Sequence, residues 1–219
     1  MGPYRPAAGR SRAAQICLAA MGVLAVLSAI HFLSGFDLVE RAVQGRLRAG
    51  EAEAFDENTA LFARLGVAGL LATGVVWFFW LHRAVANARA LGRPTEFTPG
   101  WAVGWWFVPL ANVVRPYQIV RSLMDELGAP DNRPVLWWWG SYLAAGIFAN
   151  FASFLRVPDL DGLRVFLASS LIAELLRAAS AILAFRLVGE IERRSEDVGR
   201  QKLAPEYGPP GLPIGPPAV

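Results

Sequence analysis

The chain of 219 residues contains a single cysteine, Cys17, and only two histidines. One cysteine excludes an internal disulfide, and neither histidine has a second histidine or a carboxylate at the spacing of metal ligands. We therefore expect no metal site and no cofactor. The sequence also lacks a Ser/His/Asp set, a glycine-rich phosphate loop and an H-E-x-x-H motif, so we do not expect an enzyme.

Charge is scarce as well. Charged residues make up 18% of the chain and hydrophobic residues 54%, an apolar excess that a soluble domain of this size would struggle to bury. The net charge is only +3, and no basic stripe is interleaved with aromatics, which argues against a nucleic-acid partner. The composition instead predicts an all-α integral membrane protein whose principal partner is the lipid bilayer.

Four apolar segments have the length of a membrane span, which is about 20 residues. They cover residues 13–36, 61–81, 135–155 and 163–189. Residues 1–12 carry three arginines and no acid, the charge layout of a signal peptide, but the apolar run that follows is too long and has no cleavage site. We expect an uncleaved first span with a basic cytoplasmic N-terminus.

The polar and proline-rich segments lie outside these spans. Residues 37–60 hold six acids and predict a short helical external loop. Residues 204–219 contain six prolines and few residues able to form a core, which predicts a disordered or polyproline-like tail. The helical membrane domain would then comprise residues 13–203.

Residues 99–127 are harder to assign. Thr98 and Pro99 favour a helix start, but the uncharged run that follows, residues 101–114, is short for a span. Pro109 would kink this helix, and the residues beyond it alternate between a polar and an apolar face. This pattern is typical of a re-entrant or interfacial helix.

The arginines favour four spans over the alternative of five. If residues 101–121 do not cross, the N-terminus, residues 82–134 and the tail share the cytoplasmic side and hold most of the basic residues, as the positive-inside rule requires. All eight tryptophans then lie near one membrane face, which predicts a packed aromatic layer around the re-entrant helix. We expect both termini in the cytoplasm and the protein in a bacterial plasma membrane.

The middle third contains the segments WLHRAVANARALGRP and FTPGWAVGWWFVPLANVVRPYQIVR, followed by a WWW run. These segments resemble a bacterial membrane family known only as domain of unknown function 4328, whose core pattern is W-F-x-P-x-x-N-x-x-x-P-Y. The matching positions are Trp106, Phe107, Pro109, Asn112, Pro116 and Tyr117. The resemblance implies a multi-span membrane protein and assigns no activity.

Glu174 and Arg177 are the first candidate site. They stand three residues apart near the middle of the last predicted span, where each costs about 2.5–3.5 kcal/mol on an insertion scale. One hypothesis is an ion or substrate contact inside the bundle. The other is a self-neutralising pair that fixes helix register, together with Asn150.

The second candidate site is formed by Asn112 and Arg115. With Arg83 and Arg89 nearby, a helix dipping into the membrane at Pro99 could hold a phosphate or an anionic lipid headgroup. The alternative is interfacial snorkelling by arginine and capping by asparagine. We assign interface or structural roles to five further residues, namely Trp105, Trp106, Pro109, Pro116 and Tyr117.

Two functions remain open at this point. The first is a non-catalytic scaffold or regulator that engages a protein partner through its cytoplasmic face or proline-rich tail. The second is a small transporter, channel or lipid-binding protein that uses the re-entrant helix and the Glu174–Arg177 pair. A polar path joining Glu174, Arg177, Asn150 and Asn112 would favour the second.

Overall fold

The structure, a computed structural model, describes residues 7–155, 157 and 159–203, and this part of the chain is helical without a strand. The expectation of an all-α protein is confirmed. The four long helices are α1 (Ala8–Val43), α2 (Glu51–Ala90), α5 (Arg133–Phe154) and α6 (Leu160–Leu203). Between α2 and α5 lie α3 (Pro99–Gly104), the 3₁₀ turns η1 (Trp105–Phe107) and η2 (Ala111–Val113), and α4 (Arg115–Glu126).

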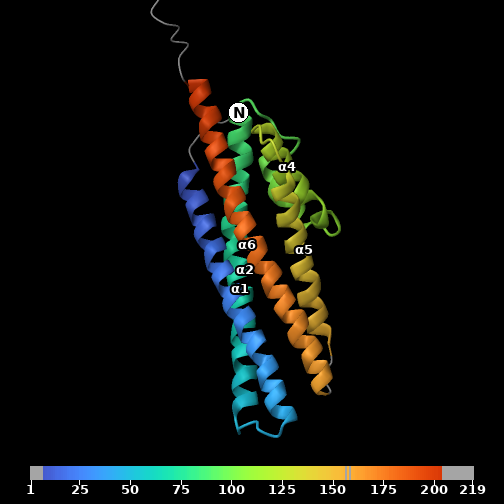
Figure 1. Ribbon diagram of the computed structural model, residues 1–219. Helices are drawn as coiled ribbons and strands as arrows, with labels where there is room; N and C mark the ends of the chain where they lie inside the picture. Colours follow the sequence, from blue (N-terminus) through green and yellow to red (C-terminus); the bar gives the residue numbers. More distant parts are fainter. Residues whose placement is uncertain (1–6, 156, 158, 204–219) are drawn as a thin grey trace, which may run out of the picture.

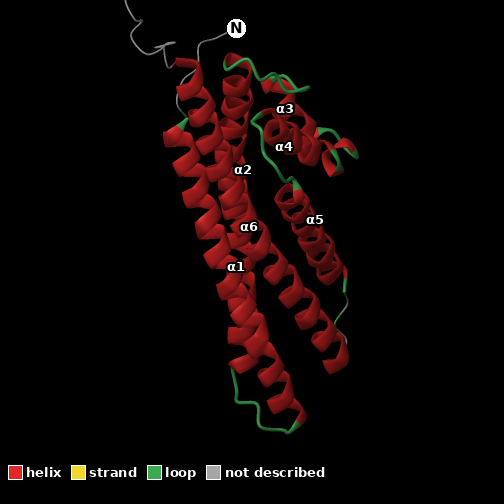
Figure 2. Ribbon diagram, turned by 45° about the horizontal axis from the view of Figure 1, so that its top comes forward, coloured by secondary structure: helices red, strands yellow, loops and turns green. Residues whose placement is uncertain are grey.

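The long helices run up and down in an elongated bundle (Figures 1 and 2). Helix α6 packs on α1 along one side and on α5 along the other, and α2 packs on α1. The start of α1, the end of α6 and the whole stretch from α3 to α4 lie at one end, which we call the terminal end. The turns from α1 to α2 and from α5 to α6 lie at the opposite end, the hairpin end.

Short polar signals set the helix boundaries at both ends. Gly92, with a φ of 77°, follows α2 in the left-handed conformation that favours glycine at a helix end. The Thr98 hydroxyl accepts a hydrogen bond from the Trp101 N–H and begins α3. At the hairpin end the Asp159 carboxylate accepts from the Gly162 N–H at 2.7 Å and begins α6.

Two of the described helices, α1 and α2, are long and apolar enough to cross a membrane. With 36 and 40 residues they extend about 54 and 60 Å, well beyond the hydrocarbon thickness. The core helix of a soluble protein would bury such a segment, but only 6% of the most apolar window of α2 and 28% of that of α1 are buried. Crossing by α5 and α6 remains a prediction.

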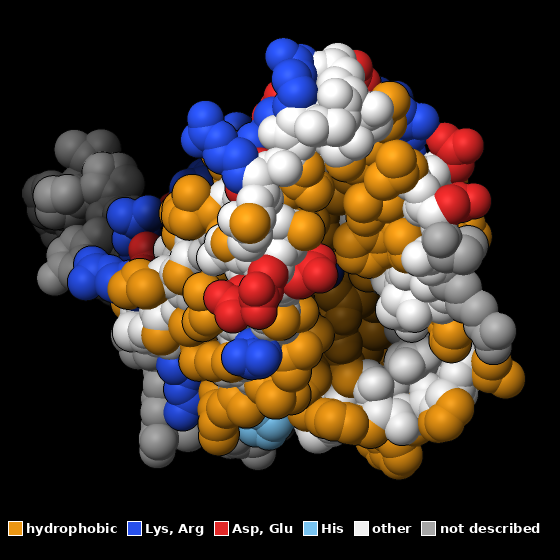
Figure 3. Space-filling view, turned by 90° about the horizontal axis from the view of Figure 1, so that it is seen from below, with side chains coloured by type: hydrophobic (Ala, Val, Ile, Leu, Met, Phe, Trp, Pro, Cys, Tyr) orange, Lys and Arg blue, Asp and Glu red, His pale blue; other side chains and the backbone are white. Residues whose placement is uncertain are grey.

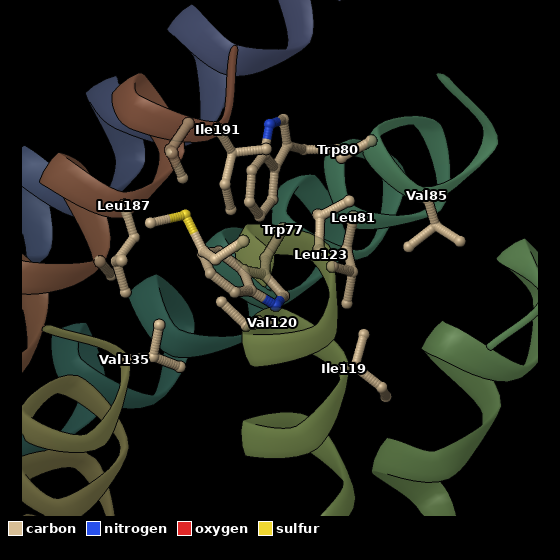
Figure 4. Close-up of a cluster of buried hydrophobic side chains, with 14 of the residues drawn as sticks. Trp77, Trp80, Leu81, Val85, Ile119, Val120, Leu123, Val135, Leu187 and Ile191 are labelled. Carbon is tan, nitrogen blue, oxygen red and sulfur yellow. The ribbon is translucent and has the colours of Figure 1, made fainter. Parts of the chain in front are cut away.

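The main hydrophobic core lies at the terminal end (Figure 4). Four of its side chains are 0% exposed, namely Trp80 and Leu81 of α2, Leu123 of α4 and Ile191 of α6. Ala14 and Leu18 of α1 belong to the same cluster. Helix α4 contributes its whole apolar face to this core. The apolar side chains of α4 therefore pack on the protein and not on lipid, because periodicity alone does not distinguish a core from a lipid surface. The position of residues 99–127 relative to the membrane remains a prediction.

Toward the hairpin end the apolar side chains point outward instead. Leu71 on α2, Ile30 on α1 and Phe154 on α5 are 65%, 59% and 82% exposed. Seen from this end, hydrophobic side chains form much of the surface, and they line a hollow in the middle of the view (Figure 3). A smaller cluster of Phe32, Val39 and Leu167 holds α1 and α6 together here.

Two expected segments have different boundaries in the structure. Residues 37–60 are mostly helical, as expected, but their helical residues belong to the long helices, because α1 continues to Val43 and α2 already begins at Glu51. Residues 99–127 do not form one helix kinked at Pro109. They form α3, η1, η2 and α4, because two prolines, at 109 and 116, interrupt the helical hydrogen-bond ladder and leave only short pieces between them.

Candidate functional site

The segment with the family pattern lies across the ends of α2 and α5. Rings from three parts of the chain meet there, at centroid distances of 5.3 Å for Trp77–Trp138, 6.3 Å for Trp77–Trp106 and 5.7 Å for Trp106–Trp139. The Trp139 Nε1–H donates to the Val113 carbonyl oxygen at 2.7 Å and ties η2 to α5. We call these four rings, together with Trp80, the tryptophan cluster.

Three indole N–H groups of this cluster have no acceptor in the described part of the chain. They belong to Trp77, Trp80 and Trp106. The labelled Trp77 and Trp80 nitrogens point in different directions in Figure 4, so they do not converge on one ligand. The cluster is chiefly an apolar packing layer, and aromatic pairs at these distances stabilise such a layer beyond the area they bury.

Pro116 and Tyr117 connect this layer to α4. Pro116 is buried at the first turn of the helix, where a missing N–H is tolerated, and Tyr117 packs on the core. Pro109 is exposed in the turn between η1 and η2. Trp105 is half-buried, and its ring centroid lies 5.0 Å from that of Trp101, with the two ring planes tilted.

Arg115 and Arg89 hold the chain rather than an open anion site. The Arg115 guanidinium lies 5.0 Å over the Trp105 ring and 6.0 Å over the Phe97 ring, and it donates to Gln118 Oε1 at 3.0 Å. Arg89 donates to the Thr95 and Phe97 carbonyls. These cation–π and backbone contacts fix the turn before α3. The expected phosphate cradle of these arginines is therefore not supported by their geometry.

The other members of that candidate site, Arg83 and Asn112, lie on α2 and in η2. Arg83 is half-buried on α2, one helical turn from the buried Asn87. Asn112 is exposed in η2 and does not cap α4, for which no side-chain cap is formed at Val114.

Glu174 and Arg177 form an ion pair, with Arg177 Nη1 at 2.6 Å from Glu174 Oε1. Glu174 is 8% exposed, and its second oxygen, Oε2, has no hydrogen-bond donor among the described residues. Arg177 extends toward α2, since a Cβ built on Gly66 would lie 3.9 Å from its Nη1.

The position of Glu174 on α6 places it toward α1. It lies two helical turns from Leu167 and two from Ala181, which contact Gly35 and Gly22 of α1. The buried Ser28 lies midway between those glycines. Glu174 therefore lies on the α1-facing stripe of α6, near the level of Ser28.

Asn150 was expected to join the ion pair, but it does not. Its side chain is exposed and donates to the Gly146 carbonyl, one turn earlier on its own helix, at 2.8 Å. An asparagine in a helix can satisfy its amide in this way, so a polar residue in an apolar segment need not have a partner on another helix. Of the four residues expected to line a polar path, only Glu174 and Arg177 meet.

The C-terminal part of α6, which continues beyond the predicted span at residue 189, carries a surface ion-pair network. Glu190 bonds Arg193 at 2.9 Å and Arg194 at 2.5 Å. The hydrogen bond from Arg193 lowers the pKa of Glu190, and the hydrogen bond from Arg194 acts in the same direction. Arg194 also donates to the Gly128 carbonyl at 2.6 Å and so ties the turn after α4 to α6.

One feature of the segment was missed from the sequence. Leu110 has a φ of 63° and ψ of −40°, and the Ala111 N–H donates to the Pro109 carbonyl at 2.8 Å. This is a γ-turn with positive φ, a strained conformation that a leucine rarely adopts. No sequence signal predicts it, because positive φ is expected at glycine or asparagine.

No group of three His, Cys, Asp or Glu side chains in residues 7–155, 157 and 159–203 is arranged to hold a metal ion. The described site thus consists of an aromatic layer, arginines that hold turns and one ion pair. Together with two helices of membrane-spanning length, it defines an all-helical protein with a tryptophan-rich layer at one end of the bundle.

The model of one protein family matches residues 44–193, and the chain therefore belongs to the family described as "Domain of unknown function (DUF4328)". The resemblance inferred from the tryptophan- and proline-containing segment is confirmed. No curated protein and no solved structure matches the chain. The matched range begins after α1 and ends within α6, so it contains the whole tryptophan cluster.

Proposed function

We propose that the chain is a four-span membrane protein with a non-catalytic role, a scaffold or regulator that engages other proteins at its terminal end. The exposure of apolar side chains on all four long helices supports membrane insertion. Water would oppose the exposure of so many large apolar groups, whereas lipid would accept them. Helices are also one of the two structures that satisfy every backbone hydrogen bond inside a bilayer.

The arrangement of the ends supports four crossings. The start of α1, the stretch from α3 to α4 and the end of α6 lie at the same end of the bundle (Figure 1). Helix α3 has only six residues and extends about 9 Å, far less than a bilayer. In this topology the terminal end is cytoplasmic, because it carries most of the arginines.

The separation of the polar candidate residues is the observation that favours a scaffold or regulator over a transporter. A transport path would need aligned polar groups reachable from water, and Asn112 and Asn150 lie apart from the ion pair. Glu174 and Arg177 pair within one helix, as expected of a pair that fixes packing. We regard the transporter, channel or lipid-binding function as the weaker candidate.

The partners follow from this topology. The bilayer surrounds the helices, and anionic headgroups would meet the arginines of the cytoplasmic end. The exposed turns of α6 beyond residue 189 offer a charged surface to a protein. The tail, residues 204–219, lies outside the described residues and is proposed as a second contact because of its prolines.

Cysteine accessibility tests both parts of the proposal. In a Cys17→Ser background, single cysteines at Gly100 and Asp131 should react with a membrane-impermeant thiol reagent only from the cytoplasm. Reaction of Asp131→Cys from outside would require a fifth crossing.

The same reagent tests for a water path at the ion pair. Ser170 and Ser180 lie on α6 on either side of Glu174 and are 7% and 5% exposed. Cysteine replaces serine with little change of volume, and Ser170→Cys and Ser180→Cys should react from neither side. Reaction at either position in the folded, membrane-inserted protein would favour the transport function instead.

A further inference from the structure

We propose that residues 107–114 insert into the lipid leaflet at the terminal end and form a one-sided membrane wedge. We call these residues the apolar tip. The inference rests on the proposed membrane topology and goes beyond it, because it identifies which part of the broken segment between α2 and α5 contacts lipid.

The apolar tip exposes large side chains without any charge. Phe107 is 70% exposed, Leu110 86%, Val113 47% and Val114 50%. Surface loops are normally polar, and several large apolar side chains exposed on one loop indicate an interaction site. The exposed polar side chain among them is that of Asn112.

The contacts of the tip place it at the level of the membrane boundary. The Phe107 ring lies 5.3 Å from the Phe78 ring, near the end of the predicted span 61–81. The Val113 carbonyl accepts the hydrogen bond from Trp139, near the start of the predicted span 135–155. If those two segments cross, the tip lies beside their boundary with the headgroups and faces lipid.

The backbone conformation at residue 110 would favour glycine, so the leucine side chain needs an explanation other than the turn. A γ-turn with positive φ is most easily built with glycine, yet a leucine occupies it with its side chain almost fully exposed. No packing inside the chain explains that choice. A contact with lipid explains it, because transfer of this side chain out of water is favourable.

Helix α4, which follows the tip, is not available for this contact. The apolar face of α4 is already buried in the core, with Ile119, Val120 and Leu123 at 0% exposure. Arg115 follows the tip directly and is held over Trp105 and Phe97. The segment therefore consists of an apolar tip with a basic residue behind it, the pattern of an interfacial anchor.

A fluorophore attached at the tip tests the inference. The full-length Cys17→Ser, Leu110→Cys protein is labelled with an environment-sensitive dye and reconstituted in vesicles of phosphatidylcholine and phosphatidylglycerol. We expect blue-shifted emission that is quenched by lipids spin-labelled near the carbonyl region and protected from aqueous iodide. Glu96→Cys, on the exposed turn before α3, is the matched control and should remain accessible to iodide.

A probe at Leu71→Cys separates failure of this inference from failure of the membrane proposal. Leu71 is 65% exposed within the predicted span 61–81 and should be quenched by deeply spin-labelled lipid. If Leu71→Cys is quenched by lipid but Leu110→Cys is quenched by iodide, the tip does not insert, and a protein partner becomes its occupant. If neither probe contacts lipid, the membrane proposal itself fails.

Discussion

At the terminal end, side chains from α1, α2, α4, α5 and α6 bury one another, whereas toward the hairpin end the same long helices expose their apolar residues. Even near the terminal end the two faces of α2 differ, since Phe79 is 63% exposed and Trp80 is 0% exposed. The terminal end has a third layer, made by α3 and α4, that the hairpin end lacks. A third layer thus produces a protein-like core where the remainder of the bundle depends on lipid.

The largest effect should come from the buried tryptophan. Trp80→Ala removes a fully buried ring and should lower the free energy of unfolding by about 3–5 kcal/mol. Phe79→Ala removes an exposed ring from the adjacent position and should change it by about 0.5 kcal/mol or less. Denaturation in mixed detergent micelles measures both, and equal effects would refute the contrast between the two faces of α2.

The ion pair tests whether the region between the two ends is held by packing or by charge. Glu174→Gln leaves Arg177 without its ionised partner and should destabilise the protein by about 2 kcal/mol. The exchanged pair, Glu174→Arg with Arg177→Glu, should recover most of that loss and restore the yield of folded protein. If the exchange is as damaging as the single change, the two residues do more than neutralise each other.

The sequence predicted the all-α class, the long apolar segments and the family from local patterns, because a span and a tryptophan motif are each written in neighbouring residues. It also placed Thr98 at a helix start. The destination of an amphipathic face is not written locally, and α4 was therefore assigned to the interface although its Ile119 and Leu123 lie in the core. The same reason explains Asn150, whose amide bonds its own helix.

A glycine contact shows that the hairpin end is tightly packed where α1 meets α6. A Cβ built on Gly35 would lie 2.5 Å from Leu167 Cδ2 and 2.8 Å from Phe55 Cζ. Gly35→Ala should therefore cost about 1–3 kcal/mol through overpacking. Gly74→Ala has nothing within 4 Å and should stabilise α2 by about 0.5–1 kcal/mol. The two signs, read from unfolding in micelles, should be opposite, and matching signs would contradict the packing described here.

The smallest expected effect is a pH dependence at the hairpin end. The Arg48 N–H donates to Glu51 Oε2 at 3.0 Å and Arg41 donates to Oε1 at 2.7 Å. The hydrogen bond from the Arg48 backbone, followed by that from Arg41, lowers the pKa of Glu51 below its ordinary value of 4.5. Because the folded pKa is the lower one, the stabilisation is present above 4.5 and is lost as the pH falls through the folded value.

Thermal midpoints between neutral and acidic pH measure this effect when wild type is compared with Glu51→Gln. The difference between the two proteins should be present at neutral pH and vanish in acid. Glu190, paired with Arg193 and Arg194, should show the same sign at the terminal end, so Glu190→Gln is the matched variant. We expect the difference in thermal midpoint to be larger for Glu51→Gln than for Glu190→Gln. The α1–α2 turn depends on the contacts of Glu51 with Arg41 and Arg48, whereas the tryptophan cluster also supports the terminal end. A larger difference for Glu190 would mean that charge, and not aromatic packing, holds α6 to that end.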